Sequence, residues 1–586
     1  MTKVFSFNKN NRDLSAGHQS LLKEVNGLNG VPKSLMPGFP DLDDQFNQMG
    51  ITHIRLHDGF GIGDMDNYVH ADRVNDNNQI IVNVPEENKP EAKKLFADIS
   101  NIRTIFPYAA VGMRNNDISL ALKEANYKMT DAYLRDIMNN NAELNPDNIQ
   151  RQIMFRIGRS VDGGYEIPED FDIYAILVST LVNRYALNYA RIGLPRKITY
   201  WQVWNEPDLY FFWNNDDPKK YYELYEKIAR IIKAVDPSVK VGGAGIAFVD
   251  RSKVDYFEGF LRYCRDNHVP LDFFSWHGYV ETGDPQNIID VGNTVQKGLN
   301  TYGFTDAESF CTEWNSCPIA TKNTYTKIQS IKNAAYIAST FIYMQYIKAD
   351  RAYYYRGDGS SFGLFNNHPN PKKPSVKNFC TYSAQSFYLF ARMFETPYIL
   401  SGNRDFSTGL TVLATENTEG NKINILAANY KVDKDFADGN VAPDYLYQQY
   451  YLDTGRLLDQ LTDNWSKDKW FGGVDPTTIR VDNAVVQHDP VKPFPSNLLK
   501  VKSRDYTDSD HGVTVVINHI NYKKFNVKAY RIQEAGSLEQ MTPPEVTNQI
   551  NVSIADNKLT LVDRGAKPST VTLYSLELSN NEFYMR

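Results

Sequence analysis

The chain has few cysteines and no apolar stretch long enough to cross a membrane. Its 586 residues include four cysteines, Cys264, Cys311, Cys317 and Cys380, too few for a disulfide framework. Neither a Cys-x-x-Cys pair nor a His-Glu-x-x-His motif occurs, so no zinc site of these types is indicated. The most apolar run, residues 334–347, is shorter than the roughly 18 residues of a membrane span and predicts a buried helix. We therefore expect a soluble protein with no membrane partner.

A strong charge of either sign is also lacking. The 63 basic and 70 acidic residues give a net charge of −7, without the basic field that a nucleic-acid partner requires. The first 14 residues contain no apolar segment typical of a signal peptide. We expect a cytoplasmic protein, or a secreted or periplasmic one if a leader has been removed. The sequence leaves the formation of a homo-oligomer open.

What the sequence does contain is a repeated unit in which an apolar strand ends in polar residues and an amphipathic helix follows. Seven such strands begin near residues 51, 153, 198, 239, 271, 307 and 350. The segment "VFSFN" near residue 4, or a neighbouring one, supplies an eighth. This alternation predicts parallel strands joined by helices, here a (β/α)8 TIM barrel with the polar strand ends at one mouth. A doubly wound open sheet is the alternative, but the glycines of "GGAGIAF" lack the dinucleotide-binding spacing.

The segment 217–237 is the clearest helix. Asp217 can cap it and Pro218 can begin it, and apolar residues recur at helical spacing up to Asp236.

The domain prediction is a catalytic barrel over residues 1–395 and a β-sandwich over 396–586. The connection 59–152 is too long for one crossover and predicts an insertion near the barrel mouth. After residue 395 short alternating strands such as "INILAANY" and "TVTLYSLEL" predict an antiparallel sandwich, with a second insertion around 440–510.

Two glutamates stand at strand ends that a barrel would bring together. Glu206 lies in "VWNEPD" at the end of the fourth strand, and Glu313 lies in "CTEWNS" at the end of the seventh. A lone glutamate is usually a solvated surface charge, but both of these follow buried strands beside tryptophan, where an idle carboxylate is costly. Two facing carboxylates are what glycoside hydrolysis needs, and a separation of about 5–5.5 Å gives retention of configuration.

These motifs resemble the clan A glycoside hydrolases, and within them glycoside hydrolase family 39, which includes β-xylosidases and α-L-iduronidases. The resemblance runs through "WNEPDLYFFWNNDDPKKYYELYEKIARIIKAVDPSVKVGGAGI" and "FLRYCRDNHVPLDFFSWHGY", and is looser at "THIRLHD" and "AYRIQE". It implies that Glu206 is the acid/base, that Glu313 is the nucleophile and that Asn205 binds the sugar 2-hydroxyl. This mechanism needs no metal or organic cofactor.

The resemblance also implies residues around the two carboxylates. His277 and Tyr279 line the site beside the nucleophile, and His57 contacts sugar hydroxyls. Arg55 can hold the nucleophile ionised, or can form a structural ion pair. The residues expected to contact substrate are Asn205, His57, His277, Tyr279, Tyr355, Arg55 and Trp314.

The sequence departs from the xylosidase pattern at the eighth strand. Tyr355 stands where a tryptophan is expected and is followed by Arg356 and Asp358. With Arg156 and Arg159 at the end of the third strand, Arg356 can bind an acidic sugar. These arginines can equally pair with Asp58, Asp162 or Asp358.

We therefore expect a retaining glycosidase of β-xylosidase type, acting from the chain end of an oligosaccharide or polysaccharide because the 59–152 insertion can block the groove. The alternatives are an endo-acting enzyme, a uronate- or arabinose-releasing enzyme, and an inactive sugar-binding barrel. Sugar-binding alone would not require both carboxylates.

Overall fold

The structure is a computed structural model in which part of the chain is described. The described residues are 2–32, 41–56, 69–74, 80–82, 128–138, 148–158, 167–168, 171–209, 212–213, 217–249, 255–279, 284–316, 328–358, 362–366, 379–406, 408–431, 478–481, 484–487, 512–534 and 538–580.

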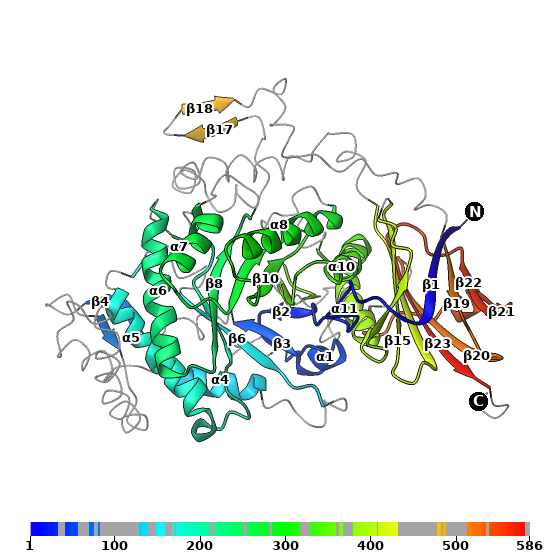
Figure 1. Cartoon of the computed structure of the whole chain (residues 1–586), viewed down its shortest axis with the longest axis horizontal. Helices are drawn as coiled ribbons and strands as arrows, with labels where there is room; N and C mark the ends of the chain where they lie inside the picture. Colours follow the sequence, from blue (N-terminus) through cyan, green and yellow to red (C-terminus); the bar gives the residue numbers. More distant parts are fainter. Residues whose placement is uncertain are drawn as a thin grey trace.

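Eight parallel strands form a closed barrel, as the alternating pattern predicts (Figure 1). In chain order they are β2 (Gly27–Asn29), β3 (His53–Leu56), β6 (Gln152–Ile157), β7 (Tyr200–Val203), β8 (Lys240–Ile246), β9 (Phe273–His277), β10 (Glu308–Trp314) and β11 (Arg351–Tyr354). Glu206 therefore follows the fourth strand and Glu313 lies on the seventh, as expected. The alternative of an open doubly wound sheet is wrong.

The barrel interior is filled in layers. Its lower layer is aromatic and apolar, with Met154, Phe273, Phe310 and Tyr353 buried together and Tyr200 packed against them. Because inward-facing side chains alternate along a strand, the next inward positions form a layer nearer the mouth. That layer is polar, and it is the floor of the site described below.

Helices surround the barrel, and α6 shows how the sequence sets one of them. The Asp217 side chain accepts a hydrogen bond from the Lys219 N–H at 3.0 Å, and Pro218 is the first helical residue. Tyr221, Leu224 and Ile228 are among the residues on its buried face. The helix ends at Val235, one residue before Asp236, so its prediction is confirmed.

The described α-helices are α1 (Asp43–Gln48), α4 (Lys128–Met138), α5 (Phe171–Val182), α6 (Pro218–Val235), α7 (Phe260–Asp266), α8 (Ile288–Thr301), α10 (Ile331–Met344) and α11 (Tyr382–Met393). Shorter π or 3₁₀ helices are η5 (Asn183–Leu187), η6 (Tyr189–Ile192), η7 (Asp255–Gly259), η8 (Pro285–Asn287) and η10 (Thr547–Gln549). Within the described part of the chain, no helix has the length and apolarity needed to cross a bilayer.

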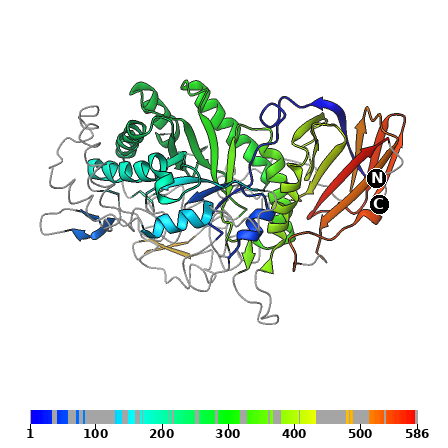
Figure 2. The same cartoon turned by 90° about the horizontal axis from the view of Figure 1, so that it is seen from below.

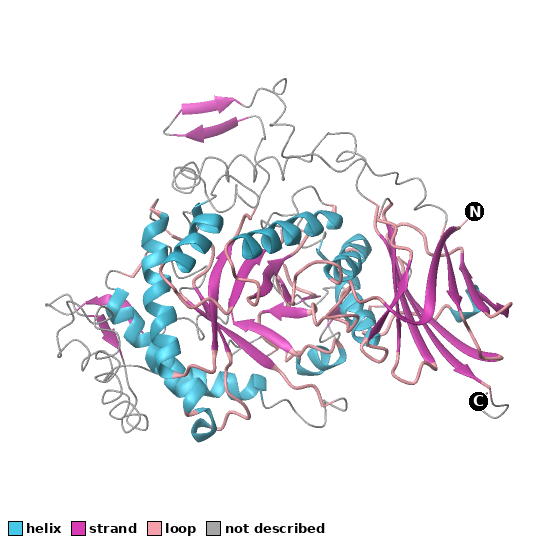
Figure 3. Cartoon of the chain, viewed as in Figure 1, coloured by secondary structure: helices cyan, strands magenta, loops and turns pink. Residues whose placement is uncertain are grey.

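The second body is a nine-stranded sheet, the group of magenta strands beside α10 and α11 in Figure 3. Its order is β20 (Lys524–Ile532), β23 (Thr570–Ser579), β16 (Lys422–Asn429), β15 (Leu410–Glu416), β14 (Tyr398–Gly402), β1 (Lys3–Arg12), β19 (Val513–Asn518), β22 (Lys558–Asp563) and β21 (Asn551–Ala555). Side chains from its two halves share one core, as in a sandwich. Every pairing is antiparallel except that of β1 with β19, a departure from the expected all-antiparallel pattern.

The first strand of the chain lies in this sheet and not in the barrel. β1 pairs with β14 and β19, and Figure 2 shows it among the late strands of the chain. The segment "VFSFN" is thus not the eighth barrel strand, and the neighbouring β2 takes that place. Along residues 4–9 of β1, buried side chains alternate with more exposed ones, a pattern that fits a sandwich strand better than a barrel strand buried on both faces.

Three two-stranded sheets complete the described strands: β4 (Val69–Val74) with β5 (Ile80–Val82), β12 (Phe365–Asn366) with β13 (Phe379–Cys380), and β17 (Thr478–Val481) with β18 (Ala484–Gln487). Most of the two predicted insertions, 59–152 and 440–510, lies outside the described residues.

Candidate active site

The floor of the barrel mouth is built around the buried guanidinium of Arg55 on β3. Its Nε donates to Gln202 Oε1 at 2.6 Å, and one terminal nitrogen donates to Asn29 Oδ1 at 3.0 Å. The same nitrogen donates to Glu313 Oε1 at 2.7 Å, and the other donates to Asn205 Oδ1 at 2.9 Å. One side chain with no exposed surface thus fixes the predicted nucleophile and the predicted 2-hydroxyl ligand together.

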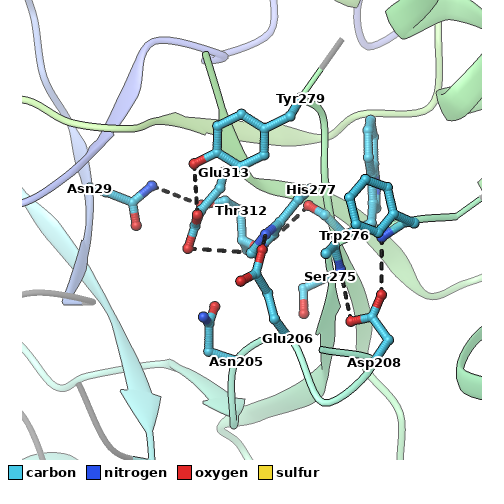
Figure 4. A network of polar contacts seen from close by, with 12 residues as sticks. Asn29, Asn205, Glu206, Asp208, Ser275, Trp276, His277, Tyr279, Thr312 and Glu313 are labelled. Atoms are coloured by element: carbon cyan, nitrogen blue, oxygen red, sulfur yellow. Dashed lines mark hydrogen bonds and ion pairs between the residues drawn. The ribbon is translucent and has the colours of Figure 1, made fainter. Parts of the chain in front are cut away.

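Glu313 reaches this floor because the strand that carries it is irregular. The register of β10 shifts against β9 between Cys311 and Glu313, which re-aims the side chains as a bulge does. The second carboxylate oxygen, Oε2, accepts a hydrogen bond from the Tyr279 hydroxyl at 2.9 Å (Figure 4). With a guanidinium on one oxygen and a phenol on the other, the ionised form of Glu313 is well stabilised.

Glu206 stands across the mouth in the loop after β7. Its φ of 45° and the φ of 68° at Trp204 lie in the left-handed region, so the chain turns sharply there. The Glu206 N–H donates to the carbonyl of Gly245 at 2.9 Å, which ties the loop to β8. The carboxyl group points toward His277, whose Nδ1 lies 2.7 Å from Oε1 (Figure 4).

The surroundings of Glu206 favour its protonated form. Burial raises the pKa of its carboxyl group to about 7, and the negative charges of Glu313 and Asp208 act in the same direction. His277 opposes this shift. Glu206 can therefore hold a proton near neutral pH, while Glu313 has two strong donors. This is the division of labour expected of an acid and a nucleophile.

His277 lies between the two carboxylates. Its Nε2 is 3.6 Å from Glu313 Oε1, and one ligand atom from each of the three residues lies within 4.8 Å of the others. Such a trio can attract a cation, but Arg55 already neutralises Glu313 at 2.7 Å. Ligands of a structural zinc must also converge to about 2 Å from a common centre. The donor set fits a proton-carrying pair of carboxylates better than a metal site.

Asn205 offers a donor at the mouth. Its Oδ1 is taken by Arg55, while its buried Nδ2 has no hydrogen-bond partner among the described residues. A buried amide N–H without an acceptor costs free energy unless a ligand supplies one. A sugar hydroxyl can be that acceptor.

Two further predicted residues lie around β11 and β10. Tyr355 is half-buried and lies near Tyr279. Burial is the chief cause of the raised pKa of Tyr279, and Tyr355 adds to it. Trp314 is not at the mouth: its side chain has no exposed surface and packs edge-on against Phe341 of α10 and Tyr354. The expectation that Trp314 contacts substrate is therefore wrong, because neighbours on a strand point to opposite sides.

Of the arginines that could bind an acidic sugar, Arg356 is paired with an aspartate. Arg356 Nε donates to both oxygens of Asp358, at 3.1 and 2.9 Å, so this arginine forms the internal pair that the sequence allowed. Arg156 is buried on β6. His57, Arg159, Asp58 and Asp162 lie outside the described residues.

The aromatic residues after Glu206 pack the loop. The Trp213 ring meets Trp204 edge-on at 5.4 Å and Tyr221 of α6 at 5.7 Å. The Trp204 indole N–H donates to the Phe212 carbonyl at 2.8 Å. Trp213 thus anchors the loop on the following helix and does not line the site.

Sequence reasoning missed Asn29, Gln202 and Asp208. Asn29 and Gln202 hold Arg55, and Asp208 holds the loop of Glu206. Asn29 and Gln202 are polar residues in otherwise apolar barrel strands, a signal that could have identified them.

Known proteins resemble this chain in its barrel and in its whole fold. Residues 156–358 match the family model described as glycosyl hydrolases family 39. A beta-xylosidase of Geobacillus stearothermophilus is 29% identical over 200 residues, covering 30% of this chain and 36% of that protein. A beta-xylosidase of Caldicellulosiruptor saccharolyticus is 28% identical over 246 residues, covering 37% and 47%. The chain thus spans less than half the length of these curated relatives in the matched regions.

Solved structures match almost the whole chain at lower identity. A glucosidase from Croceicoccus marinus has a TM-score of 0.61 at 20% identity, covering 99% of this chain and 100% of that one. A monomeric beta-xylosidase from Caulobacter crescentus CB15 has a TM-score of 0.56 at 15% identity, covering 98% and 100%. These likenesses establish the fold, a barrel with an attached sheet domain. The barrel segment 156–358, which carries both glutamates, is thus similar to glycosyl hydrolases family 39 and to the beta-xylosidases named above.

Proposed function

We propose that the protein is a retaining glycosidase that cleaves O-glycosidic bonds by double displacement. The observation that carries this proposal is the pair of buried glutamates at one barrel mouth, with a protonated form favoured at Glu206 and an ionised form stabilised at Glu313. One oxygen of each lies within 4.8 Å of the other. Such a close pair supports the retaining arrangement, in which the carboxyl groups lie about 5–5.5 Å apart, over the wider spacing of inverting enzymes, which leaves room for a water molecule between the base and the sugar.

In the first step a carboxylate oxygen of Glu313 attacks the anomeric carbon. The bond from that carbon to the leaving oxygen breaks, and Glu206 gives its proton to that oxygen. The sugar is then bound covalently to Glu313. Arg55 and Tyr279 orient the attacking carboxylate, which places its oxygen for in-line approach.

In the second step Glu206, now ionised, takes a proton from a water molecule. The water oxygen bonds to the anomeric carbon, and Glu313 leaves as a carboxylate. Arg55 and Tyr279 then stabilise the charge that returns to Glu313. Two inversions at one carbon give net retention. The free Nδ2 of Asn205 supports the contact with the sugar 2-hydroxyl that strengthens in the transition state.

The favoured substrate is a neutral sugar, and β-xylosidase-type exo action on oligosaccharides is the leading candidate. Arg55 donates four hydrogen bonds to residues of the site, and two nitrogens of Arg356 donate to Asp358. The charge of each guanidinium is thus already engaged within the protein, which favours a neutral sugar over a uronate. The matched relatives named beta-xylosidase favour xylose. Exo action rests on the 59–152 insertion and remains a prediction; end-labelled xylo-oligosaccharides would distinguish it from endo cleavage.

The test replaces Glu313 with glycine and adds azide. We expect hydrolysis of aryl glycosides to fall by several orders of magnitude, and azide to restore turnover with a glycosyl azide of inverted configuration. The matched control is Glu308→Gln, which changes a glutamate at the opposite end of the same strand, paired there with Lys240. If Glu313→Gly hydrolyses aryl glycosides as well as the parent, the proposal fails.

A panel of aryl xyloside, glucoside, arabinoside, iduronide and glucuronide tests the sugar. Cleavage of the glucuronide or iduronide in preference to the xyloside would favour the acidic-sugar alternative. Binding of sugars without turnover of any member would favour the inactive sugar-binding barrel.

A further inference from the structure

The loop that carries Glu206 is joined to the end of the next barrel strand by three hydrogen bonds. The Glu206 N–H donates to the carbonyl of Gly245 at 2.9 Å. Two residues later, Asp208 Oδ1 accepts from the Ala247 N–H at 3.0 Å, and Oδ2 accepts from the Phe248 N–H at 3.1 Å. The loop after β7 thus donates one hydrogen bond to the end of β8 and accepts two from the residues that follow it. These three bonds fix the distance between the two segments.

The Asp208 carboxylate is a buried charge close to the chemistry. Its side chain is about 1% exposed, and Figure 4 shows it projecting from the same loop as Glu206. A buried carboxylate is tolerated when its oxygens accept hydrogen bonds, and two backbone N–H groups supply them here. From α6, the Tyr221 phenol also faces this charge; burial raises the pKa of Tyr221, and Asp208 adds to the effect.

We propose that Asp208 is a positioning residue for Glu206: it holds the loop of this glutamate against the end of β8 and places a further negative charge beside it. This inference rests on the proposed glycosidase function and assigns Asp208 no contact with substrate.

The charges around Glu206 agree with this role. The titratable groups that face it are His277 from β9, Tyr279 from the loop after β9, Glu313 from β10 and Asp208 from its own loop. Burial is the largest cause of the raised pKa of Glu206, the two carboxylates raise it further, and His277 lowers it. Because the acid must be protonated to act, activity falls as pH rises through the pKa of Glu206. Removing the charge of Asp208 lowers that pKa and moves the fall to lower pH.

The variant that isolates the charge is Asp208→Asn. It keeps the size of the side chain and one acceptor oxygen, but replaces the other acceptor with a donor. We expect the alkaline limb of the kcat/KM profile to move to lower pH. We also expect a loss of about tenfold or more for a glycoside with a poor leaving group, because that substrate needs the proton from Glu206. A dinitrophenyl glycoside, which leaves without protonation, should lose much less.

The matched control is Asp236→Asn. Asp236 is also buried and accepts a backbone N–H, from Ser238 at 2.9 Å, but it precedes β8 at the far end of the barrel. Its replacement should leave the alkaline limb and the leaving-group dependence unchanged. If Asp208→Asn fails to fold, Asp208→Ser is measured instead, since it is also neutral and keeps one acceptor.

An unmoved alkaline limb, or equal losses for both leaving groups, would overturn the role of Asp208. Wild-type protein that is inactive on every glycoside would instead overturn the proposed function, so the two failures are distinct.

Discussion

At the scale of single residues, Tyr279 should act differently in the two chemical steps. Its hydroxyl donates to Glu313 Oε2 at 2.9 Å. In the proposed mechanism Glu313 loses its charge when the sugar bonds to it and regains the charge when the sugar leaves. The hydrogen bond therefore favours release of the intermediate, and a bond to a charged group contributes about 1.5–3 kcal/mol.

We expect Tyr279→Phe to lower steady-state kcat roughly 10- to 100-fold and to show a burst of phenol release with an activated aryl glycoside. Stopped-flow absorbance measures both. Tyr225→Phe is the control, because its hydroxyl donates to the Pro270 carbonyl and not to the site. A slower first step without a burst would contradict the argument.

The raised pKa of Glu206 also makes a prediction about stability. Its pKa is about 7 in the folded chain and near 4.5 when unfolded, so between these values the folded state binds more protons. The free energy of unfolding therefore falls as pH rises through this window, by an upper bound of about 3 kcal/mol. Glu206→Gln cannot ionise, so its free energy of unfolding should exceed that of the wild type at pH 8. The excess should be smaller at pH 5.

Urea unfolding at the two pH values tests this prediction. Glu308→Gln is the control, since Glu308 lies beside Lys240 away from the mouth. The free energy of unfolding of this variant should not gain on that of the wild type as pH rises. A stability difference for Glu206→Gln that shrinks as pH rises would show that the sign is wrong.

At the scale of elements, α6 is held at its start by a cap that the sequence predicted. Replacing Asp217 by alanine removes the acceptor of the Lys219 N–H and should cost about 1 kcal/mol. Glu223→Ala on the same helix is the control, because its ion pair with Lys220 is largely exposed and contributes little. Denaturant midpoints of both variants measure the difference; equal midpoints would contradict the importance of the cap.

The helix also shows why some elements could be predicted and others could not. Asp217, Pro218 and the apolar stripe are local signals, and local signals set where a helix begins and which face it buries. The strands ending at Glu206 and Glu313 were predictable for the same reason. Which sheet a strand joins depends on distant partners, so β1 could not be assigned from its own residues.

The two carboxylates of the site could be predicted from the sequence, but the residues that hold the site together could not. Glu206 and Glu313 carry a motif, whereas Asn29 and Gln202 matter only because both meet Arg55 across the barrel. Trp314 was misjudged because it directly follows Glu313 on β10, and neighbours on a strand point to opposite sides. A single residue of shift decides which side chain faces inward.

At the scale of the whole molecule, the barrel and the sheet share one core. Leu413, Leu426 and Leu573 of the sheet belong to the same buried cluster as Phe341 and Phe387 of α10 and α11. β1 joins the start of the chain to its far end, since Lys3 pairs with Val513 in parallel register. Loss of the sheet should therefore expose a face of α10 and α11 and destabilise the barrel.

A change in β1 tests this coupling far from the glutamates. Phe7 is buried in the sheet core, and Phe7→Ala should cost about 3–5 kcal/mol by leaving a cavity. We expect the temperature at which glycosidase activity is lost to fall together with the far-ultraviolet circular dichroism transition. Val4→Ala is the matched control, because Val4 lies on the same strand with 54% of its side chain exposed. If Phe7→Ala melts the sheet early while activity persists to the wild-type temperature, the two bodies unfold independently and the shared core does not couple them.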